Sequence, residues 1–253
     1  MQVLIVGDVH GRHDRLADLL ERARRALGID AAIQVGDFGF AESALGAVRA
    51  PFPVPVYAID GNHEDHRWLQ RAIDDGEAPR WAARINLFYQ PRGSTAVLGG
   101  SIVGFLGGAL HVDRPQQHNG PAGLANYIRR READAAAAEF NRVRPHLVVT
   151  HSCPGGIGIG LTGPQELRLG VLDHIVAAGF DPGPVHDCGD AELTALWSRL
   201  AYRPQAWVFG HHHRLHATTV EGTHFVCVGE SEASADQPVV WDSVDRVLWT
   251  AAR

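Results

Sequence analysis

The chain has 253 residues, 45% of them hydrophobic and 21% charged, and its formal net charge is −6. This composition is typical of a folded globular protein with one large domain or two small ones, long enough to bury a sizeable core. The negative charge argues against long nucleic acid as the main partner, because proteins that bind it by counterion release are more often basic. No run of about 18 apolar residues occurs, so we expect no membrane span.

The cysteines indicate a reducing compartment. Cys153, Cys188 and Cys227 are odd in number, widely spaced and include no Cys-x-x-Cys pair, which disfavours a disulfide framework. Residues 1–6 run directly into Gly7-Asp8 without a charged leader or a cleavable segment. We therefore predict a cytoplasmic protein.

The first hundred residues alternate between strand and helix patterns. Short apolar runs predict strands at 3–6, 31–35 and 54–59. Apolar residues at helical spacing predict helices at 15–27 and 65–73. This alternation implies parallel strands joined by right-handed crossovers.

The middle of the chain has a different pattern. Three strands are predicted close together, at 85–89, 95–98 and 101–106. The Gly99-Gly100 pair joins the last two as an antiparallel hairpin. A loop is expected at 110–125.

The second half returns to alternation. A helix is predicted at 129–143, where an alanine run favours it, and a strand follows at 146–150. The stretch 154–189 begins with a glycine-rich loop, and we interpret it as an insertion that forms a lid over the site. Further helices are predicted at 165–178 and 191–200.

Strands dominate the tail, with hairpin turns at Glu221-Gly222 and around residues 242–245. Their expected positions are 206–209, 215–220, 223–228, 238–241 and 246–250. No repeat or flexible linker is visible, so we predict a single domain over residues 1–253, of the α/β class, with two packed sheets and helices outside.

Five clusters of metal-binding residue types each follow a predicted strand. They are Gly7-Asp8-Val9-His10-Gly11, Gly36-Asp37, Gly61-Asn62-His63-Glu64, Thr150-His151 and Gly210-His211-His212-His213. Ligands of open α/β sheets bind beyond the carboxyl ends of the strands, so these side chains should meet at one edge. Together they suit two divalent cations sharing a carboxylate, and a metal pair about 3.5–4 Å apart promotes in-line attack on a phosphoryl group.

The donor types suggest how the residues divide between the two cations. Asp8 and His10 lie two residues apart, so one tight loop could aim both at the same ion. Asp37 is the natural bridge, because each carboxylate oxygen can hold a metal. Asn62 adds a neutral oxygen. His151 and His211 would complete one site and His213 the other.

This mixture of imidazole and oxygen donors, without a thiolate, suits Mn²⁺, Fe, Zn²⁺, Ni²⁺ or Co²⁺ and disfavours Ca²⁺ or a purely Mg²⁺ site. Manganese is the preferred expectation.

With His63, the clusters contain one donor more than the two cations need as ligands. We expect it to protonate the leaving oxygen or stabilise the charge that grows there. Either Glu64 or Asp60 could fix its tautomer, and Glu64 is preferred. The predicted catalytic residues are therefore His63, Asp37 and Glu64. His212, which lies between two ligands, should point away from the metals.

The five clusters resemble the motif set of the calcineurin-like metallophosphoesterases, from residue 3 to about residue 230, and the subgroup most similar is that of small bacterial and phage phosphoesterases. The resemblance implies a four-layer α-β-β-α sandwich of two mixed β-sheets with a dinuclear centre at one edge. One metal would be held by Asp8, His10, Asp37 and His213, and the other by Asp37, Asn62, His151 and His211. His63 matches the catalytic histidine of the family.

One departure separates the chain from the related serine/threonine phosphatases. In that branch Gly-Asp leads into a Val-Asp-Arg-Gly stretch whose arginine grips phosphate, whereas here Asp37 is followed by Phe38-Gly39-Phe40. Protein phosphatase activity is therefore disfavoured. Candidate substrate contacts are Arg12, beside the first cluster, and Asp113 and Arg114 in the long loop.

The leading hypothesis is a dinuclear-metal-dependent phosphoesterase that hydrolyses a small phosphomonoester, phosphodiester or nucleotide by attack of a metal-bridged hydroxide. A nuclease or phosphatase acting on nucleic-acid ends is the alternative, for which Arg129-Arg130-Arg131 is the one compact basic run. A non-catalytic binding protein with the same fold would have lost some of the metal-binding residues, and none of these residues is missing here. The sequence does not indicate an oligomeric state.

Overall fold

The computed structural model describes residues 1–109, 123–157 and 189–250. Two six-stranded sheets pack against each other, with strand orders β12-β11-β1-β2-β3-β4 and β5-β6-β7-β8-β10-β9. The first sheet contains β1 (Gln2–Val6), β2 (Ala31–Gln34), β3 (Val56–Ala58), β4 (Leu87–Tyr89), β11 (Val239–Asp242) and β12 (Val247–Thr250). The second contains β5 (Ser94–Leu98), β6 (Ser101–Leu106), β7 (Leu147–Thr150), β8 (Ala206–Phe209), β9 (His216–Val220) and β10 (Thr223–Cys227).

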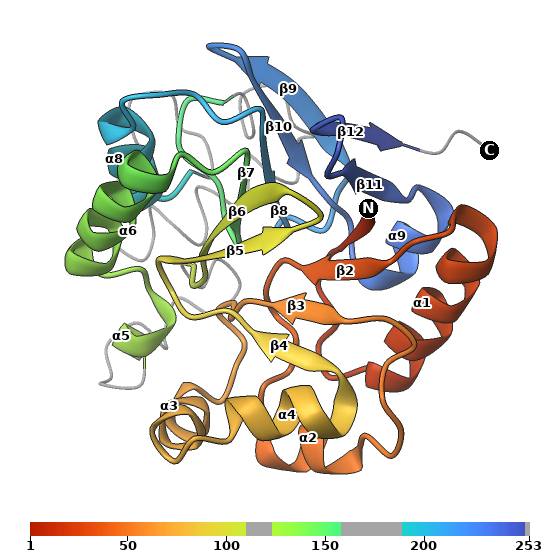
Figure 1. The fold of residues 1–253 in the computed structure, drawn as a ribbon. Coiled ribbons are helices and arrows are strands. Elements are labelled where there is room, and N and C mark those ends of the chain that lie inside the picture. The colour runs from red at the N-terminus through yellow and green to blue at the C-terminus, as the bar shows by residue number, and fades with distance from the viewer. Residues whose placement is uncertain (110–122, 158–188, 251–253) are drawn as a thin grey trace.

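Helices cover the outer face of each sheet (Figure 1). Outside the first sheet lie α1 (His13–Leu27), α2 (Glu42–Ala47), α3 (His66–Asp74), α4 (Ala78–Ile85) and α9 (Ser231–Asp236). On the side of the second sheet lie α5 (Gly123–Asn126), α6 (Arg130–Val143) and α8 (Ala191–Arg199). The predicted α/β sandwich of two mixed sheets flanked by helices is thus confirmed.

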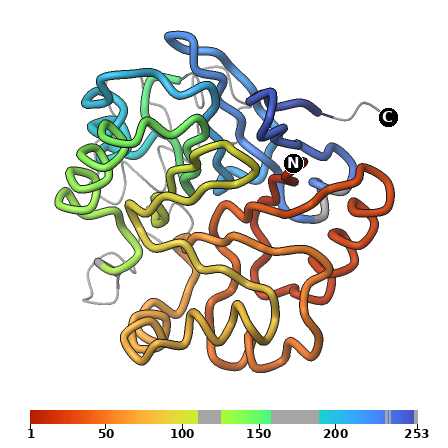
Figure 2. The backbone as a smooth tube through the Cα atoms, viewed as in Figure 1, coloured from red at the N-terminus to blue at the C-terminus, as the bar shows by residue number. Residues whose placement is uncertain are grey.

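Residue alternation explains why the strands are buried on both faces. In β1, Leu4 and Val6 pack under the helices, whereas Val3 and Ile5 face the other sheet. Successive side chains of a strand point to opposite faces, so a four-residue apolar run fills two cores at once. The N-terminal strand β1 pairs with β11, the last strand but one, and Figure 2 shows the red start of the chain beside its blue final part.

The direction of the strands positions the site. Strands β1 to β4 are mutually parallel, and so are β6, β7, β8 and β10. The loops after β2 and β7 meet, because His151 Nδ1 lies 2.8 Å from the carbonyl oxygen of Val35. The carboxyl ends of both parallel sets therefore face the same edge of the sandwich.

Most predicted elements are confirmed within two residues, but several short helices were missed. The strand predicted at 85–89 begins at Leu87, because Ile85 closes the unpredicted helix α4. Helices α2, α5 and α9 also have too few turns for a visible apolar period. The helix predicted at 165–178 and most of the lid at 154–189 lie outside the described residues. None of the described helices is long and apolar enough to cross a membrane.

Candidate metal centre

The predicted donors come together at the carboxyl ends of five parallel strands. Asp8 and His10 follow β1, Asp37 follows β2, and Asn62 and His63 lie in the loop after β3. From the second sheet, His151 follows β7 directly, and His211 and His213 follow β8. We divide these donors into an outer group, Asp8, His10 and His213, and an inner group, Asp37, Asn62, His151 and His211.

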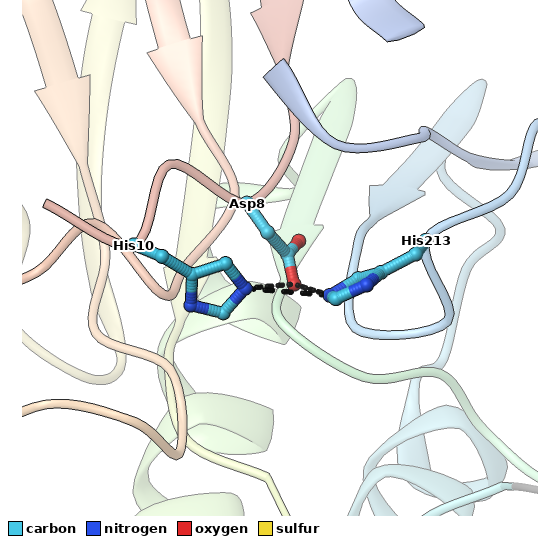
Figure 3. A group of neighbouring side chains, drawn as sticks. All are labelled: Asp8, His10 and His213. Carbon is cyan, nitrogen blue, oxygen red and sulfur yellow. Dashed lines mark hydrogen bonds and ion pairs between the residues drawn. The ribbon is translucent and has the colours of Figure 1, made fainter. Parts of the chain in front are cut away.

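The outer group converges on one carboxylate (Figure 3). His213 Nε2 lies 2.8 Å from Asp8 Oδ2, and His10 Nε2 lies 3.9 Å from the same oxygen. The two imidazole Nε2 atoms are 3.5 Å apart. These three ligand atoms could therefore share one cation.

The inner group centres on His151, which is fully buried. Its Nε2 lies 3.3 Å from Asp37 Oδ2 and 3.1 Å from Asn62 Oδ1. The ring of His211 packs beside that of His151, with the ring centres 5.0 Å apart.

Asp37 connects the two groups. Its Oδ2 atom faces one imidazole of each, because His10 Nδ1 lies 4.0 Å away on the outer side. Ligand atoms of Asp8, Asp37 and His151 also lie within 4.8 Å of one another. A carboxylate in this position can be shared between two ions.

Three features indicate that the donors fit divalent cations. Among the described residues, the Nε2 atom of His211 is buried without a hydrogen-bond partner, a costly arrangement unless another ligand satisfies it. Burial lowers the pKa of His211 well below its usual value, so the ring is neutral, as a metal ligand must be. The donor set, finally, combines carboxylate, amide and imidazole groups, as expected for first-row transition metals.

Two buried donors of the site, Asp37 and His151, balance each other's charge. Burial opposes charge on both Asp37 and His151, yet their contact lowers the pKa of Asp37 well below its usual range and raises that of His151 to about 10. Without cations, a proton on His151 therefore balances the buried carboxylate.

Glycines pack directly against the donors. A Cβ atom on Gly61 would lie 2.1 Å from Asp37 Oδ1, and one on Gly210 would lie 2.4 Å from Asp8 Oδ1. A Cβ on Gly36 would lie 2.4 Å from His151 Nδ1. The glycine in each of these clusters is therefore needed for space behind a ligand.

The backbone of the site is unusual in handedness. Four ligand-bearing residues have positive φ angles: His10 at 50°, Asp37 at 53°, His211 at 66° and His213 at 51°. Non-glycine residues rarely adopt this left-handed region, and such strain gathers at functional sites. It turns each side chain back towards the centre immediately after its strand.

Glu64 has partners other than the one expected. Its carboxylate accepts hydrogen bonds from four backbone N–H groups, those of Phe38, Gly39, Phe40 and Gly61, at 2.6–3.2 Å. Burial and the nearby charge of Asp37 raise the pKa of Glu64 to about 7. Glu64 therefore ties the loop carrying Asp37 to the loop carrying Asn62 and His63.

Asp60, the other candidate for orienting His63, is bonded to Arg92 and Tyr89. His63 itself is half-buried, its backbone N–H donates to Asp37 Oδ1 at 2.9 Å, and its ring centre lies 5.4 Å from that of His10.

Glu230 is a functional candidate that the sequence patterns did not reveal. Its Oε1 lies 2.8 Å from His213 Nδ1, on the side of the ring opposite Asp8. Its other oxygen accepts a hydrogen bond of 3.1 Å from Arg12. Arg12, predicted to contact substrate, is thus bound to Glu230 in this structure. Glu230 follows β10, whose carboxyl end lies beside that of β8.

The remaining predicted residues are His212, Asp113 and Arg114. His212 is buried, its Nε2 lies 3.8 Å from Cys153 Sγ, and its ring centre lies 5.0 Å from that of His211. Asp113 and Arg114 lie outside the described residues, as does Cys188. Cys153 and Cys227 are both buried.

Comparison with known proteins agrees with this geometry. The profile of the calcineurin-like phosphoesterase family matches residues 1–215. Among solved structures, the protein TT1561 of Thermus thermophilus has a TM-score of 0.59 at 12% identity, over 99% of this chain and 97% of that one. A Staphylococcus aureus protein provisionally assigned as a 5′-nucleotidase has a TM-score of 0.54 at 15% identity, over 99% of this chain and 52% of that one. None of the curated proteins matches the sequence.

The structural neighbours show the fold, and the family profile covers most of the chain. The protein therefore belongs to the calcineurin-like phosphoesterase family, as its motifs predicted. It is a phosphate-ester hydrolase, with carboxylate and imidazole groups placed to hold divalent metal ions.

Proposed function

We propose that the protein hydrolyses a small phosphomonoester, phosphodiester or nucleotide with two divalent cations, preferably Mn²⁺. The observation that carries this proposal is the position of Asp37 between the inner and outer groups. The outer group and Asp37 would hold one ion, and Asp37 with the rest of the inner group would hold the other. When bound, such ions activate water for attack on phosphorus and neutralise charge on the phosphoryl oxygens.

The protein's own residues then position and protonate. Glu64 holds the loops of Asp37 and Asn62 in register, and Glu230 orients the ring of His213. His63, next to the shared carboxylate and outside both ligand groups, donates a proton to the leaving oxygen.

Two further properties, a small substrate and a cytoplasmic location, belong to the proposed function. The net charge of −6 supports a small substrate rather than long nucleic acid. The odd number and wide spacing of the cysteines, Cys153, Cys188 and Cys227, support a cytoplasmic location.

Hydrolysis of bis-p-nitrophenyl phosphate and p-nitrophenyl phosphate across a panel of metals tests the reaction. We expect activity with Mn²⁺, near-complete loss in Asp37→Asn, and a loss of about 10²–10⁴-fold in His63→Ala. His224→Ala is the matched control, because His224 lies at the amino end of β10, at the opposite edge of the sheet. Inactivity with every metal on both esters, or full activity of His63→Ala, would refute the proposal.

A further inference from the structure

A cavity lies beside the metal centre and includes none of its ligands. Its volume is about 600 Å³, within the range of about 300–1,000 Å³ typical of small-molecule sites. It is lined by α3, the segment after β4, and residues of α5 and α6. Helices α3 and α5 lie side by side in Figure 1.

The cavity concentrates positive charge in an acidic protein. Its lining includes two carboxylates, Asp60 and Glu132, and five arginines: Arg67, Arg71, Arg92, Arg129 and Arg131. This leaves an excess of three positive charges in a chain whose net charge is −6. A local field of this sign attracts anions.

The two carboxylates are already used. Asp60 Oδ2 accepts two bonds from Arg92, at 2.6 and 3.0 Å, and Glu132 Oε2 accepts a third, at 3.0 Å. Arg92 is only 12% exposed and also donates to backbone carbonyl groups of α5 and the residue after it. The charge of Arg92 is therefore balanced by these carboxylates, and the other four arginines of the lining carry the excess positive charge.

Those remaining arginines surround the cavity mouth. Arg67 and Arg71 are exposed and one turn apart on α3, so they share a face of the helix. Arg131 is exposed at the start of α6. Within the described residues, no acidic side chain lies within ion-pair distance of these three guanidinium groups.

The walls between the charges are apolar. Leu69, Ile73 and Pro91 line the same cavity. Guanidinium groups bind phosphate oxygens in a bidentate manner, and an apolar wall accommodates an organic body. The combination fits a phosphorylated small molecule better than a bare ion.

The cavity opens at the edge that carries the metal centre. Strand β4 is parallel to β3, and the cavity begins at Tyr89, where β4 ends. One loop borders both sites: Asp60 and His66 line the cavity, whereas Asn62 and His63 belong to the metal centre. A side-chain nitrogen of His66 lies 3.0 Å from the carbonyl oxygen of Gly61.

We propose that this arginine-lined cavity binds the phosphate groups of a small organic phosphate of nucleotide size. The site is separate from the metal ligands and needs no metal for binding. It deepens the proposed function if the bound phosphates belong to the substrate itself.

Calorimetric titration of the full-length, metal-stripped protein tests the site without the metal centre. ADP and adenosine are the probes, because they differ only in phosphate. We expect saturable ADP binding, no adenosine binding, and at least about a tenfold loss of ADP affinity in Arg67→Ala/Arg71→Ala. Arg131→Ala gives a second, independent variant if the double variant folds poorly.

Two control variants test whether the loss of ADP binding belongs to this cavity. Arg22→Ala/Arg25→Ala on α1 removes the same charge from an exposed helix outside the cavity, and it should bind ADP normally. His224→Ala, at the amino end of β10, should also bind ADP normally. Absence of ADP binding, equal binding of adenosine, or equal loss in either control would overturn the proposal.

A single-stranded oligonucleotide of about 12 nucleotides is the competing occupant. If it binds in a salt-sensitive manner that requires Arg67 and Arg71 while ADP does not bind, the proposal is wrong and an extended strand path replaces it.

Kinetics of the metal-loaded enzyme then identify the source of the phosphate, and this step rests on the proposed function. If the cavity holds a substrate arm, Arg67→Ala/Arg71→Ala raises KM about tenfold for a nucleotide ester and leaves bis-p-nitrophenyl phosphate unchanged. If it holds a separate effector, KM is unchanged for both and ADP changes kcat only in the unmodified protein. Both results support the site, and calorimetry remains decisive even if no ester is hydrolysed.

Discussion

The inner and outer groups of the metal centre use similar donors in different surroundings. In the inner group, His151 is fully buried and Asp37 is 1% exposed, whereas the outer imidazoles of His10 and His213 are 29% and 41% exposed. The inner donors are held by buried contacts, since the carbonyl oxygen of Val35 fixes His151 and the buried carboxylate of Glu64 fixes the neighbouring loops. In the outer group, His213 is oriented by a side chain, Glu230, that is 33% exposed.

This difference separates two costs of building a metal site. Burying charged and polar donors costs folding free energy, which the inner group recovers only through close pairing. Exposed donors cost less folding free energy. Other groups must hold their orientation, however, because water competes for their hydrogen bonds. We therefore expect changes in the inner group to alter stability, and changes in the outer group to alter metal affinity.

The largest effect should come from removing the inner histidine. His151→Ala leaves Asp37 buried without its partner, so the metal-free protein should lose about 3–5 kcal/mol of unfolding free energy. His213→Ala should cost about 1 kcal/mol or less, because water can replace an exposed ring. Urea unfolding of both variants after metal removal measures the contrast, and equal losses would contradict it.

Glu64→Gln should have the next largest effect. The new amide NH₂ would face two backbone N–H groups that now donate to the carboxylate, so we expect a loss of about 2–3 kcal/mol. Glu221→Gln is the control, because Glu221 pairs with Arg203 at the surface. Thermal and urea unfolding should separate the variants, and equal stability would mean that Glu64 does not hold the loops.

Replacing Gly61 tests the space behind Asp37. In Gly61→Ala the added carbon would overlap Asp37 Oδ1, so the protein should lose about 1–3 kcal/mol and bind metal poorly. Gly46→Ala is the matched control, because Gly46 lies in α2 with open space around it. It should be neutral or up to about 1 kcal/mol more stable. Unfolding and metal analysis of both variants check this.

The smallest effect on folding is expected at Glu230. Glu230→Gln removes the charge that orients His213, and one of two Mn²⁺ ions should bind about 10- to 100-fold more weakly. Stability of the metal-free protein should change by less than about 1 kcal/mol. Stepwise Mn²⁺ titration followed by magnetic resonance resolves the two ions. Equal weakening of both would show that the groups are not independent.

The gathering of the predicted donors at one edge could be expected from the sequence, because their positions depend on local order. Each cluster follows a short apolar strand, and parallel strands bring their carboxyl ends to one edge. Glu230 escaped this reasoning because β10 forms a hairpin with β9 and yet lies parallel to β8. Only the strand order β8-β10-β9 reveals that the carboxyl end of β10 lies at the site. Local sequence patterns do not predict strand order.

Other features depended on three-dimensional detail. Four backbone N–H groups donate hydrogen bonds to the carboxylate of Glu64. They converge on it because Asp37 and Gly39 both have positive φ angles. The arginine-lined cavity brings together α3 and α6, whose arginines lie far apart in the sequence. Periodicity along one helix contains no information about which helix lies opposite.

The left-handed backbone at His10, His211 and His213 has a practical consequence for dissecting the centre. Asparagine tolerates this conformation much better than branched residues, since its short polar side chain bonds locally. His→Asn exchanges should therefore delete an imidazole and keep the loop, whereas valine, isoleucine or threonine would disturb both. A saturation library at these positions should rank substitutions by backbone tolerance before it ranks them by chemistry.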